Sequence, residues 1–231
     1  IVEWDDVQED VKEQIEDFIQ KGGKILAESA LNQKKTAITV YAESTPNPSV
    51  MKYVANKALT TKVVEFKNID EAFPSPLSIE LFKFPFVKEI FIDENYISIQ
   101  KYDFADWNEI SQELRVFIRE FIEKGGVVVD ESKIKEAPKQ AQQDIPNFEH
   151  LDVTSQEIIN ILEEYVKPAV QSDGGNILFD SYDPKEKRVK VILQGACSGC
   201  PSSTFTLKNG IENMLKDMLK DNDIKVEAIN M

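Results

Sequence analysis

The sequence predicts an α+β protein, in which an N-terminal α+β domain is joined by a flexible linker to a small domain with the element order α-β-β-α-β. Three observations predict this architecture. Several segments carry apolar residues at steps of three and four, as amphipathic helices do. Others are short apolar runs bounded by turn residues, as strands are. Finally, the polar, proline-containing stretch at residues 131–154 separates the two sets of elements and is predicted to be the linker.

An internal repeat defines the start of the first domain. Aligning Trp4 with Trp107 also aligns Gly22 with Gly125, and no gap is needed. Both copies carry apolar residues at helical spacing up to a Lys-Gly-Gly end, which predicts an amphipathic helix closed by a glycine cap. Residues 1–30 are therefore interpreted as a partial, truncated copy of an N-terminal-type module. After each glycine end a short strand is predicted, at residues 25–26 and 127–129.

The complete N-terminal domain is predicted over residues 36–130. Its turns are the segment Thr45-Pro46-Asn47-Pro48 and a hairpin turn at Asn95 beside Glu94, because Pro, Asn and Asp favour turns. Its strands are predicted at residues 37–41, 51–54, 62–66, 87–92 and 96–100, with a short helix at 77–84.

The C-terminal domain is predicted over residues 155–231. Ser155 is expected to cap its first helix, Pro168 to kink or tighten that helix, and Gly174 and Gly175 to end it. Strands at residues 176–182 and 188–194, a helix at 202–219 and a strand at 225–229 complete the order.

The net charge and the lengths of the apolar runs exclude two classes of partner, nucleic acids and membranes. A formal charge of -14 and a pI near 4.6 repel phosphate backbones, so no nucleic-acid partner is expected. The apolar runs fall short of the ~20 residues that a bilayer span needs, so no membrane association is expected. Residues 1–6 lack the basic start and apolar stretch of a secretory signal. The absence of a secretory signal, together with a cysteine pair typical of a reducing compartment, predicts a cytoplasmic protein.

The chemistry is expected at Cys197 and Cys200, the only two cysteines of the chain. Two cysteines spaced by two residues can direct both sulfurs at one metal centre, and iron-sulfur clusters and zinc favour thiolate ligands. Pro201 suits the first turn of a helix, whose positive end would lower the pKa of the Cys200 thiol. The spacing alone leaves four readings open: cluster binding, dithiol redox chemistry, zinc binding and inert packing.

Other polar residues receive more ordinary interpretations. His150 lies in the predicted linker and is expected to be solvated, and Asp173 precedes two glycines, where a capping role is expected. Trp4 and Trp107 are expected to anchor helices in the core. No nucleophile, base and orienting group stand together in the sequence, so the protein is not expected to be an enzyme.

Several motifs resemble a known family. Residues 165–175 (YVKPAVQSDGG), 193–203 (LQGACSGCPSS) and 206–212 (TLKNGIE) resemble the NifU C-terminal domain of Nfu-type iron-sulfur carriers. Upstream, residues 45–48 (TPNP), 52–53 (KY), 73–77 (FPSPL) and 106–108 (DWN) resemble the N-terminal domain of the same carriers. Together the two resemblances span most of the chain, in the family's order.

The resemblance implies an iron-sulfur cluster scaffold or carrier that binds iron through Cys197 and Cys200. Its partners would be upstream cluster-assembly proteins and apo iron-sulfur client proteins. Four thiolates are the usual requirement of a [4Fe-4S] cluster and each chain offers two, so one cluster shared between two chains of a homodimer is expected. The alternatives are a dithiol-disulfide oxidoreductase and a zinc protein closed by dimerisation, both using the same cysteines.

Overall fold

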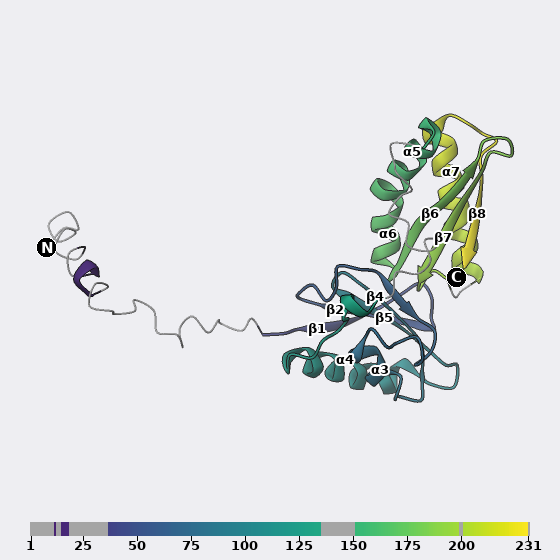
Figure 1. The fold of residues 1–231 in the computed structure, drawn as a ribbon. Helices are drawn as coiled ribbons and strands as arrows, with labels where there is room; N and C mark the ends of the chain where they lie inside the picture. The colour runs from purple at the N-terminus through teal and green to yellow at the C-terminus, as the bar shows by residue number, and fades with distance from the viewer. Residues whose placement is uncertain (1–11, 13–14, 19–36, 135–150, 199–200, 231) are drawn as a thin grey trace, which may run out of the picture. The chain divides into compact units, whose positions relative to one another are not determined.

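The computed structural model describes residues 12, 15–18, 37–134, 151–198 and 201–230 (Figure 1). The chain divides into two units, Ile1–Ala37 and Ile38–Met231. In the first unit residues 15–18 are helical. The remainder of the predicted partial repeat, with Trp4 and the strand at 25–26, lies outside the described residues.

Residues 38–134 contain a five-stranded antiparallel sheet with the strand order β1-β2-β5-β4-β3. The predicted hairpin is confirmed, and Glu94 at its turn has a φ of 43°. The first strand was predicted too early, because its pairing with β2 begins only at Val40. The strands are β1 (Val40–Ser44), β2 (Val50–Ala55), β3 (Val64–Phe66), β4 (Val87–Asp93) and β5 (Tyr96–Lys101).

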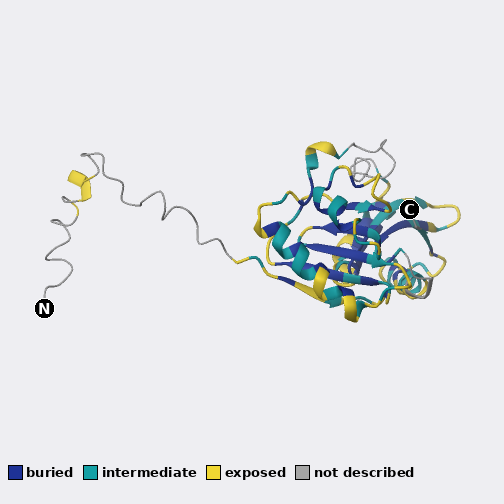
Figure 2. Ribbon diagram, turned by 90° about the horizontal axis from the view of Figure 1, so that it is seen from below, coloured by how far each residue is buried: buried dark blue, intermediate teal, exposed yellow. Residues whose placement is uncertain are grey.

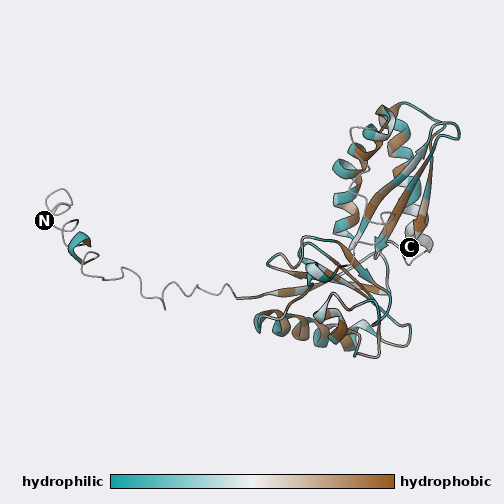
Figure 3. Ribbon diagram, in the orientation of Figure 1, coloured by the Kyte–Doolittle hydropathy of each residue, from teal (hydrophilic) through white to brown (hydrophobic). Residues whose placement is uncertain are grey.

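Helices α3 (Pro76–Leu81) and α4 (Trp107–Glu123) lie on one face of this sheet (Figure 1). Asp106 caps α4, and Gly125, at a φ of 81°, follows its end, as the glycine signal predicts. The apolar side of α4, brown in Figure 3, supplies buried core residues. These are Ile110, Leu114, Ile118 and Ile122.

The strand predicted at residues 127–129 is wrong, because this segment is irregular. Val128 and Val129 are nevertheless buried in the core. The Ser75 hydroxyl, at the start of α3, donates a 2.6 Å hydrogen bond to the Val128 carbonyl. The backbone of this segment is thus bonded to a helix cap rather than to a neighbouring strand, which explains why an apolar run does not form one.

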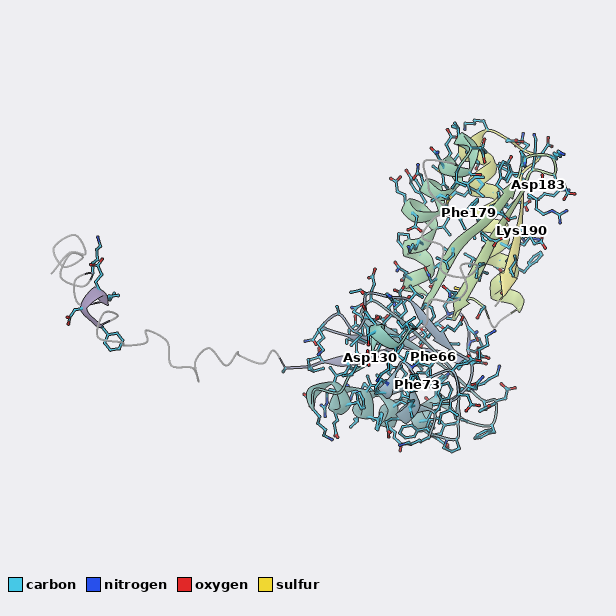
Figure 4. All side chains as sticks on the ribbon, in the orientation of Figure 1. Phe66, Phe73, Asp130, Phe179, Asp183 and Lys190 are labelled. Atoms are coloured by element: carbon cyan, nitrogen blue, oxygen red, sulfur yellow. The ribbon has the colours of Figure 1, made fainter. Side chains whose placement is uncertain are left out.

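Residues 151–230 form the α-β-β-α-β arrangement that the sequence predicts. Strand β6 (Gly175–Asp183) pairs antiparallel with β7 (Arg188–Gly195), and β8 (Lys225–Asn230) pairs parallel with β7 after the crossover helix α7 (Pro201–Leu219). Figure 4 labels Phe179 and Lys190 on the two paired strands and Asp183 at their turn.

The first helical stretch of this domain consists of three parts: α5 (Val153–Ile161), a π-helical segment (Leu162–Val166) and α6 (Lys167–Ser172). Of the two effects predicted for Pro168, a kink or a tightening, the tightening is wrong, because the helix widens just before the proline. Proline has no N–H to donate to the carbonyl four residues earlier, and a wider turn accommodates that loss. Gly174, at a φ of 82°, follows the end of α6, as predicted.

One apolar core joins the helices of this domain to one face of its three-stranded sheet. In Figure 2 dark blue marks the buried residues of the chain, many of which lie in strands. The core takes residues from α5, α6, β6, β7 and α7, and Cys197 is one of its members. It includes Ile158, Val170, Ile177, Val191, Leu193, Ile211 and Leu215. In the described parts of the chain, no helix is long and apolar enough to cross a membrane.

The cap of α5 is Asp152 rather than the predicted Ser155. The Asp152 carboxylate accepts the Ser155 N–H at 3.0 Å, and the Ser155 hydroxyl also donates to it. The hydrogen bonds from Ser155 lower the pKa of Asp152.

Asp152→Ala is expected to lower the free energy of unfolding by about 1 kcal/mol, because the first turn of α5 loses its acceptor. Since the pKa of Asp152 is lowered in the folded state, this contribution is present above the unfolded pKa and disappears as the pH falls through the folded pKa. Urea unfolding at neutral and acidic pH measures both effects. Equal losses of stability at both pH values would contradict the capping interpretation.

Candidate functional site

Cys197 lies in the turn between β7 and α7. This turn is held at both ends: Ser198 donates its N–H and its hydroxyl to the Gly195 carbonyl, at 3.1 and 2.9 Å, and the Thr204 hydroxyl donates to the Cys197 carbonyl at 3.0 Å. Helix α7 starts at Pro201, one residue before the predicted start, and includes the proline in its first turn. Cys200 lies outside the described residues, so of the predicted pair the structure places Cys197.

The Cys197 side chain is 7% exposed and packs against Gly175 across the sheet. A Cβ added at Gly175 would lie 2.8 Å from the Cys197 Sγ, so the glycine leaves the room that the sulfur occupies. Burial raises the pKa of the Cys197 thiol to about 12, and the negative charge of Asp173 contributes to the shift. Around neutral pH the thiol is therefore protonated in this conformation, whereas a metal ligand must be a thiolate.

A pocket of about 420 Å³ reaches Cys197. It is lined by both domains of the unit Ile38–Met231, with the turn after β1 on one side and the cysteine turn and α7 on the other. The lining residues are Pro46, Asn47, Asp173, Ala196, Cys197, Thr206 and Leu207. Asp173, expected only as a helix cap, is the C-cap residue of α6 and also lines the pocket.

Asn47 is a site residue that the sequence did not single out. It is 3% exposed, and its side-chain amide donates a 3.1 Å hydrogen bond to the Ala196 carbonyl, next to Cys197. The turn that carries it is fixed by Trp107, whose indole N–H donates to the Pro48 carbonyl at 3.0 Å. The motif at residues 45–48 was the available signal, but only the tertiary contact shows what it reaches.

The donor set of the described residues fits a soft metal centre in chemistry but is incomplete in number. Thiolates suit iron-sulfur clusters and zinc. The described part of the chain contains no group of three or more His, Cys, Asp and Glu side chains that could hold a metal ion. His150 lies outside it. Among the described residues, Cys197 is therefore an incomplete ligand set for such a centre.

Fold and site together define a class: a two-domain α+β protein with a thiol turn at the N-terminal end of a helix. Residues 40–125 match the family model described as "Scaffold protein Nfu/NifU N terminal", and residues 158–227 match the "NifU-like domain". The chain belongs to the Nfu-type family of NifU-like proteins, as its motifs indicate.

Named relatives agree with this assignment. "NifU-like protein 4, mitochondrial" of Arabidopsis thaliana is 33% identical over 186 residues, which are 80% of this chain and 64% of that protein. The human "NFU1 iron-sulfur cluster scaffold homolog, mitochondrial" is 32% identical over 180 residues, 77% of this chain and 66% of that protein. The chain thus spans less than two thirds of the length of these relatives.

Among solved structures, the NMR structure of a NifU-like protein from Saccharomyces cerevisiae is similar. It is 25% identical and covers 42% of this chain and 88% of its own, with a TM-score of 0.37.

The expected cytoplasmic location is wrong. The relatives from Arabidopsis thaliana, Drosophila species and Homo sapiens are named mitochondrial. The prediction depended on composition and on a cysteine pair typical of a reducing compartment, and neither distinguishes the cytosol from an organelle interior.

Proposed function

We propose that the protein is an iron-sulfur cluster carrier that binds its cargo through Cys197 and Cys200 and passes it to apo client proteins. The observation that carries this proposal is the placement of Cys197 at the turn before α7, within a domain that matches the NifU-like family model. The names of the relatives, which include the words iron-sulfur cluster scaffold, support it.

The cargo is proposed to be one [4Fe-4S] cluster held between two chains. Each chain supplies two cysteines, and four thiolates are the usual ligand set of this cluster. Because both chains would present the same turn, a two-fold axis through the cluster is the simplest arrangement. The metal bonds themselves would link the chains, so little further interface is needed.

Delivery is then an exchange of ligands. Each bond between iron and the sulfur of Cys197 or Cys200 is replaced by a bond to a client thiolate, and the carrier sulfur is released to take up a proton. An upstream assembly protein loads the carrier by the same exchange in reverse. The mitochondrial names of the relatives favour a mitochondrial site of action.

Anaerobic reconstitution with ferrous iron and sulfide tests the proposal. We expect about four irons per dimer by metal analysis, a dimer by light scattering that returns to monomer on chelation, and restored activity of an apo [4Fe-4S] enzyme. Mössbauer spectra identify the cluster type. A cluster-loaded species that stays monomeric would contradict the shared site.

The same samples test the two alternatives. Reduction of insulin disulfides at thioredoxin-like rates without uptake of iron would indicate the dithiol-disulfide oxidoreductase. Tight binding of zinc by a dimer that takes up no iron and sulfide would indicate the zinc protein.

A further inference from the structure

The outer face of the five-stranded sheet is defined as the face opposite α3 and α4. An antiparallel sheet with helices on one side usually exposes its other side to water. Here the outer face is buried: Phe91 is 2%, Tyr96 4% and Val54 7% exposed. These three residues alternate along their strands with members of the main core and form a cluster of their own. Something other than the helices covers them.

What covers the outer face is the C-terminal domain, at the end where α6 turns into β6. The Tyr96 hydroxyl donates a 2.9 Å hydrogen bond to the Gly175 carbonyl. On the same strand, the Ser98 hydroxyl donates to the Gly174 carbonyl at 2.6 Å. A Cβ added at Gly174 would lie 2.7 Å from the Ser98 Oγ, so the surfaces meet where the helix-ending glycine has no side chain.

Charge complementarity adds to this contact. The Lys52 ammonium donates to the carbonyls of Gln171 and Ser172 at 2.9 and 3.2 Å, at the carbonyl end of α6, where a positive charge is stabilised. A second hydrogen bond has its donor in the C-terminal domain: the Gln171 side-chain amide donates to the Asp93 carboxylate at 3.0 Å. Lys52 and Asp93 are 8% and 4% exposed, and each also has a partner in its own domain, Glu43 and Tyr96. The partners across the contact complete the pairing of these two buried polar groups.

The contact extends to the cysteine turn itself. The Gly195 N–H donates to the Glu65 carboxylate at 2.9 Å, and the Asn47 amide donates to the Ala196 carbonyl. A Cβ at Gly195 would lie 2.9 Å from the Phe91 ring. Burial raises the pKa of Glu65, which agrees with a dry contact. The two residues that precede Cys197 are thus both bound by the N-terminal domain.

We propose that residues 38–134 act as a reversible cap, whose outer face closes over the cysteine turn at residues 195–198. In the closed conformation the cap engages the backbone on the N-terminal side of Cys197, and the turn at Asn47 forms one wall of the pocket that reaches its sulfur. In this conformation the N-terminal domain occupies the side of the turn at Gly195 and Ala196, where the same turn of a second chain would have to approach. The consequence for cargo, which depends on the proposed function, is that the cap must open before a cluster is shared.

The cap is testable in the apo protein, without iron. In the whole chain carrying Cys200→Ser, Cys197 is the only thiol. Its burial within its own domain is the same in all variants, so a difference in its rate of alkylation by iodoacetamide reports a difference in how often the cap is open. Lys52→Glu places a carboxylate against the carbonyls of Gln171 and Ser172 and is expected to speed alkylation about tenfold or more. The matched control is Lys83→Glu, the same charge reversal at an exposed lysine that pairs with Glu80 of α3, on the opposite side of the sheet, and it is expected to leave the rate unchanged.

Small-angle scattering gives a second measurement that does not involve the thiol. The radius of gyration is expected to increase for Lys52→Glu and to stay at the wild-type value for Lys83→Glu. Equal alkylation rates and equal radii for Lys52→Glu and wild type would overturn the cap. Circular dichroism confirms that each variant is folded, since Lys52 lies outside the main core.

Reconstitution in the background with both cysteines separates the cap from the proposed function. We expect Lys52→Glu to load iron and sulfide faster than wild type. If alkylation and scattering support closure while no variant loads a cluster, the cap stands and the carrier function fails. If clusters load at the same rate in Lys52→Glu and wild type, the proposed control of loading is overturned and the carrier function stands.

Discussion

Cys197→Ser is expected to reduce iron and acid-labile sulfide in the reconstituted protein to background. In a cluster shared by two chains this single substitution removes two of the four thiolates, one from each chain. A serine oxygen is a poor ligand for a soft metal centre, and the remaining pair cannot hold the cluster alone. Iron and sulfide analysis after desalting measures the loss.

Folding and ligation must be distinguished in this test, because Cys197 belongs to the core of its domain. A hydroxyl at this position is expected to cost about 1–3 kcal/mol of stability if it finds no partner, so thermal unfolding is measured alongside. The control is Ser198→Ala, which keeps both cysteines and removes only the hydroxyl that donates to the Gly195 carbonyl. Normal iron content in Cys197→Ser, or equal loss in Ser198→Ala, would refute the assignment of Cys197 as a ligand.

Gly175→Ala is expected to destabilise the C-terminal domain markedly while leaving both cysteines in place. Its Cβ would lie 2.6 Å from the Gln194 carbonyl oxygen and 2.8 Å from the Cys197 Sγ. The carbonyl belongs to β7, whose pairing with β6 prevents a simple shift. We expect a loss of about 1–3 kcal/mol by overpacking, measured by urea unfolding.

Gly210→Ala is the matched control for this prediction. Gly210 lies on α7, and nothing stands within 4 Å of the position its Cβ would take. Alanine has the higher helix propensity, so this variant is expected to be more stable by about 0.5–1 kcal/mol. Similar stability changes for the two glycine variants would show that the close approach at Gly175 does not matter.

The parts of the fold predicted from sequence are those fixed by local patterns. The period of α4, its glycine end and the hairpin of β4 and β5 follow from spacing and turn residues close in the chain. The misjudged parts depend on distant partners. The apolar run at residues 127–129 predicts a strand, but the Val128 carbonyl accepts a hydrogen bond from Ser75 instead. The π-helical turn before Pro168 depends on how the helix packs against the rest of its domain.

The candidate site shows the same division. Cys197 stands out in the sequence because cysteine is rare in this chain and its motif is specific. The roles of Lys52, Asn47 and Glu65 could not be predicted, since each acts on a carbonyl or an N–H more than a hundred residues away. Backbone groups carry no side-chain signature, so no sequence motif marks them as binding partners.

The parallel pairing of β8 with β7 has a consequence for the order in which the chain acquires its structure. A parallel neighbour requires a crossover, here the whole of α7, so the three-stranded sheet cannot be completed until the segment after that helix has left the ribosome. Residues 38–134 emerge earlier and contain their own sheet and helices. We therefore expect the N-terminal domain of a nascent chain to fold before β7, the strand that precedes Cys197, pairs with β8. Cys197 would then be synthesised when the surface that covers its turn is already formed.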